Sequence, residues 1–262
     1  MLARAAMHIH SDWSYDGRWP LSKLASAFGK AGYRFIFTAE HDASFDNCRW
    51  ESYRRACIEA GNGRIAIVPG IEYSDPANTV HVLVWGDMPF LGAGLDTASL
   101  LERVNDLNGL AVLAHPSRRG ACRKFDPSWA PFLLGVEQWN RKVDGVAPCA
   151  EATALLNMVP GLAPFVGMDF HTVNQFFPLA MVLQVEGGFS VEGALNAMRN
   201  RRFSAQALGV SLGVFTSGSL GRAAAVAERF RRSVRNAVRR VDGQKDNDKK
   251  PVAPEPLHWT SR

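Results

Sequence analysis

Short runs of apolar, β-branched or aromatic residues alternate along the chain with segments whose apolar residues recur every three or four positions. The first kind of run is typical of buried strands, and the second of amphipathic helices. Helices are predicted at 20–32, 48–60, 97–107, 150–158 and 190–200. Strands are predicted at 6–10, 34–40, 65–73, 80–85, 110–114, 135–139, 164–166 leading into 168–171, and 179–185.

This alternation favours an α/β protein with a parallel sheet covered by helices. Polar clusters fall at or just after the C-terminal ends of most predicted strands, where a β/α barrel places its chemistry. An open doubly wound sheet would gather such residues at one switch point, not on five or six strands. The pattern therefore favours a barrel.

Histidines and acids recur together in six clusters between residues 7 and 171. Imidazole and carboxylate together bind borderline cations such as zinc, manganese or iron. Each cluster alone is equally typical of a capped, solvated or core histidine, but six in order predict a metal centre. The nine candidate metal ligands are His8, His10, Asp16, His41, Glu72, His81, His115, Asp169 and His171.

The spacing of two ligand pairs supports a shared site. Residues two apart in a strand face the same side, so His8 and His10 are expected to reach one ion from one strand. Asp169 and His171 have the same spacing. Nine ligands exceed the needs of one tetrahedral ion and suffice for two or three bridged ions.

Composition sets broad limits. The 262 residues allow one large domain or two small ones, and 47% hydrophobic with 21% charged residues is ordinary for a globular protein. Cys48, Cys57, Cys122 and Cys149 form no Cys-x-x-Cys and are expected to be reduced thiols in a cytoplasmic protein. Neither a signal peptide nor a transmembrane segment is expected.

Positive charge is concentrated near the C-terminus. Residues 221–262 hold eleven Lys and Arg against five Asp and Glu, a net charge of +6 within a chain total of +5. Residues 1–220 therefore carry −1. The overall field of this body does not indicate nucleic-acid binding.

The chain is expected to divide into four segments. They are a catalytic barrel over 1–203, a final strand or linker over 204–220, a basic amphipathic helix over 221–241 and a disordered tail over 242–262. Apolar residues recur at helical spacing in the helix, at Val226, Phe230, Val234, Val238 and Val241. This face would either pack on the barrel or, with residues 222–250, contact an anionic membrane or nucleic acid.

The ordered clusters His-x-His, Asp-Gly, Glu-His-Asp, Gly-x-Glu, His, His-Pro and Asp-x-His resemble those of the PHP (polymerase and histidinol phosphatase) superfamily of metal-dependent phosphoesterases. The resemblance covers roughly residues 7–203. It implies a distorted (β/α)7 TIM-like barrel with a trinuclear site of zinc, manganese or iron. The chain is similar to the small stand-alone members that act on nucleotides or short nucleic acids.

The resemblance also implies how the ligands are shared, with Glu72 as a bridge between two ions. The three implied sets are His8, His10, Glu72 and Asp169; Glu72, His81 and His115; and Asp16, His41 and His171. Many relatives have Thr-Asp-His where this chain has Ala39-Glu40-His41, and some have histidine at the place of Asp16. An oxygen ligand at that place favours harder ions such as manganese.

The predicted function is hydrolysis of phosphate mono- or diesters by metal-activated hydroxide, in an exonuclease-like or phosphatase-like enzyme. Asp16, Glu72 and His171 are the expected catalytic residues. Two or three divalent ions (Mn, Zn or Fe) are the expected cofactors. A phosphorylated small molecule or short nucleic acid is the expected substrate, and no obligate protein partner is indicated.

Several further side chains are candidates for roles around the ions. Asp42 and Asp144 are predicted to orient histidines. The candidates for binding substrate phosphate lie on predicted loops near the ligands, at Arg18, Arg118, Arg119, Arg141 and Lys142. The aromatic candidates for a pocket wall, which are equally typical of packing, are Trp13, Trp139, Phe170, Phe176 and Phe177.

Two other functions fit parts of the pattern. An amidohydrolase-like C–N hydrolase also opens with His-x-His, but typically ends its ligand set with a lone aspartate. The Asp169-x-His171 pair favours the phosphoesterase. A regulatory or binding module would keep the same ligands for stability, and turnover of a generic phosphodiester distinguishes it from an enzyme.

Overall fold

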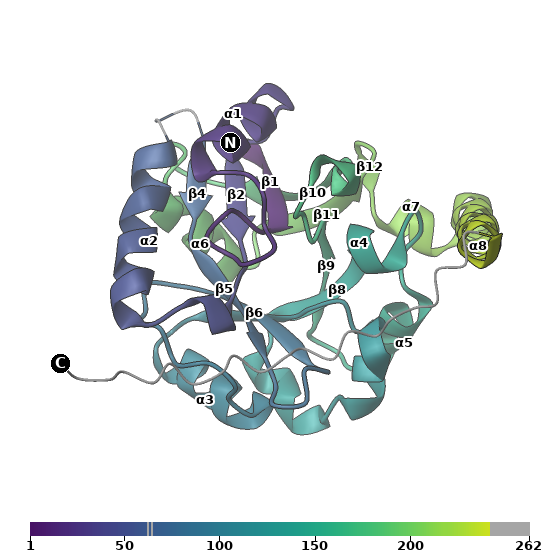
Figure 1. The fold of residues 1–262 in the computed structure, drawn as a ribbon, viewed down its shortest axis with the longest axis horizontal. Coiled ribbons are helices and arrows are strands. Elements are labelled where there is room, and N and C mark those ends of the chain that lie inside the picture. The colour runs from purple at the N-terminus through teal and green to yellow at the C-terminus, as the bar shows by residue number, and fades with distance from the viewer. Residues whose placement is uncertain (62, 64, 242–262) are drawn as a thin grey trace.

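The computed structural model describes residues 1–61, 63 and 65–241, and has an α/β architecture with two six-stranded sheets (Figure 1). One sheet has the order β12-β11-β10-β1-β2-β4. Its strands are β1 (Leu2–Ile9), β2 (Phe35–Thr38), β4 (Ala66–Val68), β10 (Leu179–Gln184), β11 (Phe203–Ala207) and β12 (Val210–Ser211). This sheet therefore continues past residue 203.

The second sheet has the order β3-β5-β6-β7-β8-β9. Its strands are β3 (Glu40–His41), β5 (Gly70–Ser74), β6 (His81–Trp85), β7 (Leu110–Leu113), β8 (Gly135–Asn140) and β9 (Ala163–Gly167). The α/β class is confirmed, but the prediction of a parallel sheet is wrong in part, since β5, β6 and β7 are antiparallel. The turn between β5 and β6 is too short for a parallel crossover.

The strand predicted at 65–73 is two strands in different sheets. Its first part, β4, pairs with β2, and its second part, β5, pairs with β3 and β6. Pro69 separates them, and proline has no N–H to donate to a ladder. The chain crosses here from one sheet to the other.

The predicted helices are all present, within a few residues of their expected ends. The helices are α1 (Leu21–Lys30), α2 (Asn47–Gly61), α3 (Thr97–Asp106), α4 (Arg141–Asp144), α5 (Ala150–Met158), α6 (Val191–Arg199), α7 (Gly213–Thr216) and α8 (Gly218–Val241). The Ser190 hydroxyl caps α6 by accepting a hydrogen bond from the Gly193 N–H at 3.0 Å, as predicted. Short 3₁₀ turns lie at Asp42–Ser44, Arg118–Lys124, Pro127–Phe132 and Val173–Gln175.

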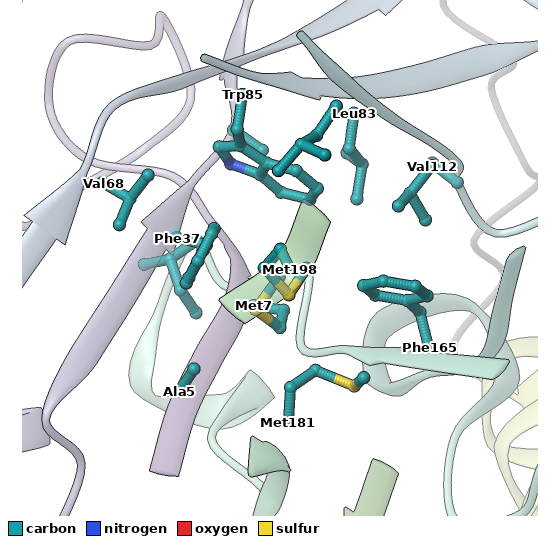
Figure 2. Packing of buried hydrophobic residues seen from close by; sticks show 14 of the residues in the cluster. Ala5, Met7, Phe37, Val68, Leu83, Trp85, Val112, Phe165, Met181 and Met198 are labelled. Carbon is teal, nitrogen blue, oxygen red and sulfur yellow. The ribbon is translucent and has the colours of Figure 1, made fainter. Parts of the chain in front are cut away.

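The two sheets adjoin at the end of β1 and share one interior. Ile9 forms a parallel bridge to Phe170, and its carbonyl accepts the Ala39 N–H at 2.9 Å. Met7 and Phe37 from one sheet lie in the same buried cluster as Trp85 and Phe165 from the other (Figure 2). Across the residues that the structure describes, the ladders form two sheets and not one closed ring.

The C-terminal region is helical up to Val241, and α8 begins three residues before the predicted helix. It lies at the periphery beyond α7 and is seen nearly end-on in Figure 1. The predicted disordered tail, 242–262, lies outside the described residues. Among the described helices, none has the length and hydropathy needed to cross a membrane.

Candidate metal centre

Irregular backbone at the strand ends positions several of the nine candidate ligands. His8, His115 and Asp169 have φ angles of 59°, 23° and 49°, a region that non-glycine residues rarely occupy. Each such conformation costs on the order of 1–3 kcal/mol, and such strain is concentrated at functional sites. The ladder between β1 and β2 shifts register between Met7 and Ile9.

This register shift changes how the first two histidines meet. His8 lies in the irregularity and His10 just beyond β1, so simple strand alternation does not place them. Their ring centroids are nevertheless 5.2 Å apart. The Phe170 backbone secures this segment, because its N–H donates to the His8 carbonyl at 3.1 Å and its carbonyl accepts the His10 N–H at 2.9 Å.

Glu72 lies at the centre of the cluster, buried on β5. Oε1 of Glu72 is 2.6 Å from His81 Nδ1 and 2.8 Å from His115 Nε2. Its other carboxylate oxygen, Oε2, is 3.2 Å from His41 Nδ1 and 3.5 Å from Nε2 of both His8 and His10. Burial would raise the pKa of Glu72, but the surrounding histidines hold it well below its usual range.

A second acidic position, Asp16, joins the outer histidines. Oδ1 of Asp16 is 3.2 Å from His41 Nε2, and Oδ2 is 3.0 Å from His171 Nε2. Burial opposes the charge on Asp16, yet hydrogen bonds from His171 and His41 lower its pKa. The pKa of His41 rises to about 10, because bonds to Asp16 and Glu72 outweigh desolvation.

The last carboxylate, Asp169, is buried and lies near two of the histidines that also contact Glu72. Its Oδ1 is 3.9 Å from His8 Nε2, 3.6 Å from His10 Nε2 and 3.3 Å from His171 Nδ1. Lys142 Nζ is 3.1 Å from the same oxygen. Burial would raise the pKa of Asp169, but Lys142 and His8 lower it.

These donors fit divalent ions. Nε2 of His8 and Nε2 of His10 are fully buried, and neither has a hydrogen-bond partner in the part of the chain described. Two ligand atoms of one tetrahedral ion lie about 3.4 Å apart when the bond lengths are about 2.1 Å. The distances of 3.5 Å from Glu72 Oε2 to Nε2 of His8 and of His10 are close to this value. Three groups of donor atoms lie within 4.8 Å of one another: His10, Asp16, His41 and His171; His8, Glu72 and His115; and His8, His10 and Asp169.

Two buried carboxylates that the sequence analysis did not assign support the cluster. Glu137 accepts hydrogen bonds from His8 Nδ1 at 2.9 Å, the His115 N–H at 2.8 Å and Asn140 Nδ2 at 2.9 Å. A Cβ on Gly167 would lie only 1.7 Å from the Glu137 carboxylate, so only glycine fits there. The signal for Glu137 in the sequence is a charged side chain within the strand predicted over 135–139.

Glu40 is the other supporting carboxylate. It accepts hydrogen bonds from the Ser11 N–H at 3.0 Å, from the Ser14 hydroxyl and from the Tyr53 hydroxyl at 3.2 Å. The Ser14 oxygen in turn accepts the His41 N–H at 3.0 Å. Glu40 therefore holds the loop that carries Asp16 against the strand end that carries His41.

The predicted orienting role of Asp42 and Asp144 is wrong. Asp42 accepts hydrogen bonds from the N–H groups of Ser74 and Gly94, and Asp144 accepts a hydrogen bond from the Ser117 hydroxyl at 2.6 Å. Neither has a histidine as a hydrogen-bond partner among the described residues. Burial raises the pKa of Asp144 to about 6. Both carboxylates connect loops, because neighbours in sequence need not be neighbours in contact.

A cavity of about 770 Å³ lies against the cluster and is lined by Asp16, His41, Glu72, His81, His115 and Asp169. Of the five cationic candidates, Arg118 and Lys142 line it. Arg118 Nη1 donates to the Asn78 carbonyl at 3.2 Å and lies 2.9 Å from His81 Nε2. Arg119 is exposed and also donates to the Asn78 carbonyl at 3.2 Å.

Arg18 and Arg141, like Arg119, do not line the cavity. Arg18 is exposed and is not part of the lining. The Arg141 guanidinium lies 5.2 Å from the centre of the Phe177 ring, on the side where α4 meets α8. A place on the same loop as a metal ligand therefore does not bring a side chain to the cavity.

The aromatic wall is also different from the predicted one. None of the predicted aromatic residues lines the cavity that the described residues form. Tyr15 lines it, 75% exposed, and stacks on His41 with centroids 4.9 Å apart. The predicted residues pack elsewhere, as Trp139 does against Phe177 and Phe170 against Phe28.

No protein-family model matches the sequence, and no curated protein matches it. Solved structures do match. A two-domain protein from Bacteroides vulgatus, described as containing a predicted PHP-like metal-dependent phosphoesterase, has a TM-score of 0.61 at 17% identity over 79% of this chain. PsfC from Pseudomonas syringae has a TM-score of 0.59 at 15% identity over 87% of this chain.

A lesion-specific endonuclease from Pyrococcus furiosus, PfuEndoQ, has a TM-score of 0.54 at 13% identity over 76% of this chain. The chain spans 98% of PsfC, but only 65% of the Bacteroides protein and 56% of PfuEndoQ. At these identities the likeness is one of fold. The resemblance indicated by the ordered motifs is confirmed at that level: this chain has the fold of PHP-like metal-dependent phosphoesterases.

Proposed function

We propose that this chain is a metal-dependent phosphoesterase that hydrolyses phosphate mono- or diesters of nucleotides or short nucleic acids. The observation that carries the proposal is the convergence of nine histidine and carboxylate side chains beside an open cavity, with buried Glu72 among them in contact with five histidines. The two adjoining sheets correspond, in this proposal, to the distorted (β/α)7 barrel that the resemblance implies.

The ligands divide by position. Glu72 would bridge, with His81 and His115 on one oxygen and His8, His10 and His41 on the other. Asp16, His41 and His171 would hold the outermost ion. When bound, two or three divalent ions of Mn, Zn or Fe lower the pKa of water and neutralise charge on phosphoryl oxygens. Glu72, Asp16 and His171 are the proposed catalytic residues.

The protein side chains bind and orient the substrate. Arg118 and Lys142 present positive charge at the cavity wall, where they can pair with phosphate oxygens. Tyr15 offers an exposed ring above His41 on which a base can stack. A cavity of about 770 Å³ is of the size that holds a nucleotide-sized ligand.

The charge balance favours a small or short substrate. Residues 1–220 carry a net charge of −1, so their overall field does not attract a long duplex. A nucleic-acid substrate is also supported by PfuEndoQ, a lesion-specific endonuclease with this fold. Short oligonucleotides and nucleotides satisfy both considerations.

An activity screen tests the proposal. Manganese-loaded protein is offered nucleoside bisphosphates, short oligonucleotides and sugar phosphates, with phosphate or nucleotide release as the measurement. An N-acyl amino acid in the same screen tests the C–N hydrolase alternative. Turnover of the amide alone would replace the proposal, and turnover of none would favour a binding module.

The chain is expected to bind two or three transition-metal ions. Elemental analysis after reconstitution and gel filtration gives the stoichiometry. The melting temperature should rise with metal and fall with chelator, because ions that bind only the folded state stabilise it by roughly 2.7 kcal/mol at a free concentration of 100 times Kd. One ion or fewer per chain would contradict the polynuclear assignment.

Arg118→Ala is expected to raise KM or lower kcat by about thirtyfold, since loss of a charge-assisted bond to phosphate costs about 2 kcal/mol. Arg119→Ala, outside the cavity, is the matched control and should change both constants little. Metal content is measured in both variants, because Arg118 lies 2.9 Å from His81. Equal constants in both variants and wild type would remove Arg118 from the substrate site.

A further inference from the structure

Helix α8 packs on the body through a polar stripe. The Glu228 carboxylate is only 6% exposed and accepts the Val146 N–H at 2.9 Å. Arg231 Nε and Arg232 Nε each lie 2.7 Å from it. Burial would raise the pKa of Glu228, but these two arginines lower it to about 2. The charge therefore remains, and Glu228 joins α8 to the loop after α4.

The apolar residues of α8 face the other way. Residues two positions from Glu228, Val226 and Phe230, are turned from it by about 160° around the helix. Val226, Phe230 and Val234 are 54%, 71% and 46% exposed. The alternative in which this face packs on the barrel is therefore wrong for these residues. Val238 and Val241 lie where the structure does not describe side chains.

Positive charge borders this apolar stripe. The helix sequence carries seven arginines and one acid, Glu228, which is already paired. Arg222 and Arg229 are exposed and lie within about 60° of Val226 around the helix, whereas Arg235, also exposed, lies within about 20° of the direction of Glu228. The outward surface of α8 thus combines a row of large apolar side chains with arginines and no acidic side chain among its described residues.

Three kinds of partner could cover this surface of α8, and they differ in how they would contact its apolar stripe and its arginines. Nucleic acid would pair with the arginines but leave Phe230 and the valines in water. A second copy of the helix would cover the apolar stripe but bring its own arginines against these. An anionic lipid surface covers the stripe with acyl chains and meets the arginines with headgroups. Seven arginines keep such a helix in the plane of the interface.

We propose that α8 is an in-plane membrane anchor that binds anionic lipid bilayers through Val226, Phe230 and Val234, with its arginines at the headgroups. The Glu228 contact then holds the body on the opposite side of the helix. The proposal does not depend on the reaction catalysed in the cavity.

Sedimentation of the full chain with vesicles tests the proposal. Wild type should sediment with vesicles of equal parts phosphatidylglycerol and phosphatidylcholine, and not with phosphatidylcholine alone. Phe230→Ser should weaken binding by at least about tenfold. Ile58→Ser is the matched control, since Ile58 is 73% exposed on α2, and should bind as wild type. The double change Arg222→Gln with Arg229→Gln should also weaken binding, and added salt should weaken the binding of wild type in the same direction.

Absence of binding to the anionic vesicles, or equal binding by wild type and Phe230→Ser, would contradict the proposal that α8 is a membrane anchor. A concentration-dependent dimer that Phe230→Ser abolishes would instead assign the stripe to a second copy. Oligonucleotide binding that Phe230→Ser leaves intact, without vesicle binding, would assign the arginines to nucleic acid. Turnover of a small phosphoester should be unchanged in Phe230→Ser, which separates this test from that of the proposed function.

Discussion

Glu72→Gln is expected to abolish turnover and to reduce the metal content of the chain by at least one ion. The carboxylate has five histidines within 3.5 Å, spread over both of its oxygens. Glutamine has the same shape but only one oxygen and no charge, so it cannot bridge two ions. Loss of a residue that merely supports a ligand costs about 10–100-fold in metal affinity, and loss of the bridge should exceed that.

Elemental analysis and a metal-saturated activity assay measure the two effects together. Glu102→Gln, an exposed change of the same chemistry on α3, is the matched control and should retain metal and rate. Circular dichroism of both variants without metal shows whether the fold survives. A folded Glu72→Gln protein with wild-type metal content and rate would show that Glu72 does not bridge.

The convergence of the nine candidate ligands could be predicted from the sequence because their chemistry is distinctive and local. His-x-His, Asp-x-His and the isolated glutamate after Gly70 stand out against apolar runs, and strand ends of an α/β fold converge. The positions of the helices could also be predicted, because the apolar periodicity of a helix is a local property of the sequence. The short turn between β5 and β6 also indicated antiparallel pairing of these two strands. The overall βα alternation favoured a parallel sheet instead, and this signal was not used.

The supporting contacts could not be predicted, because they depend on long-range packing. Glu137 meets His8 across 129 positions of sequence, whereas Asp42, adjacent to His41, turns to the backbone of Ser74 and Gly94. The amphipathic pattern of α8 likewise identifies an apolar face without saying which way it points. The contacts from Glu228 to the Val146 N–H and from Arg232 to the Asp144 carbonyl fix that orientation.

Glu137→Gln is expected to weaken metal binding by about 10–100-fold. The carboxylate accepts from His8 Nδ1 on one oxygen and from His115 N–H and Asn140 Nδ2 on the other. An acceptor at Nδ1 requires the proton of His8 there, which leaves Nε2 free to ligate. Glutamine keeps only one acceptor oxygen. That oxygen would stay with the His115 N–H and Asn140 Nδ2, which are two donors, and the NH₂ group would then face His8 Nδ1. His8 would then carry its proton on Nε2.

This tautomer change gives the test a readout beyond activity. Metal affinity is measured by chelator competition, and the ¹⁵N shifts of the His8 ring report which nitrogen is protonated in the metal-free protein at a pH high enough to make His8 neutral, because burial opposes its charge but nearby carboxylates raise its pKa. Excess metal should restore much of kcat, because the ligand itself remains. Glu59→Gln, exposed on α2, is the control for loss of a carboxylate. Wild-type metal affinity in a folded Glu137→Gln protein, with the His8 proton still on Nδ1, would show that Glu137 only packs beside the centre. Weakened binding together with the changed tautomer would show that the centre requires the proton of His8 to be held on its far side by a residue that ligates no ion itself.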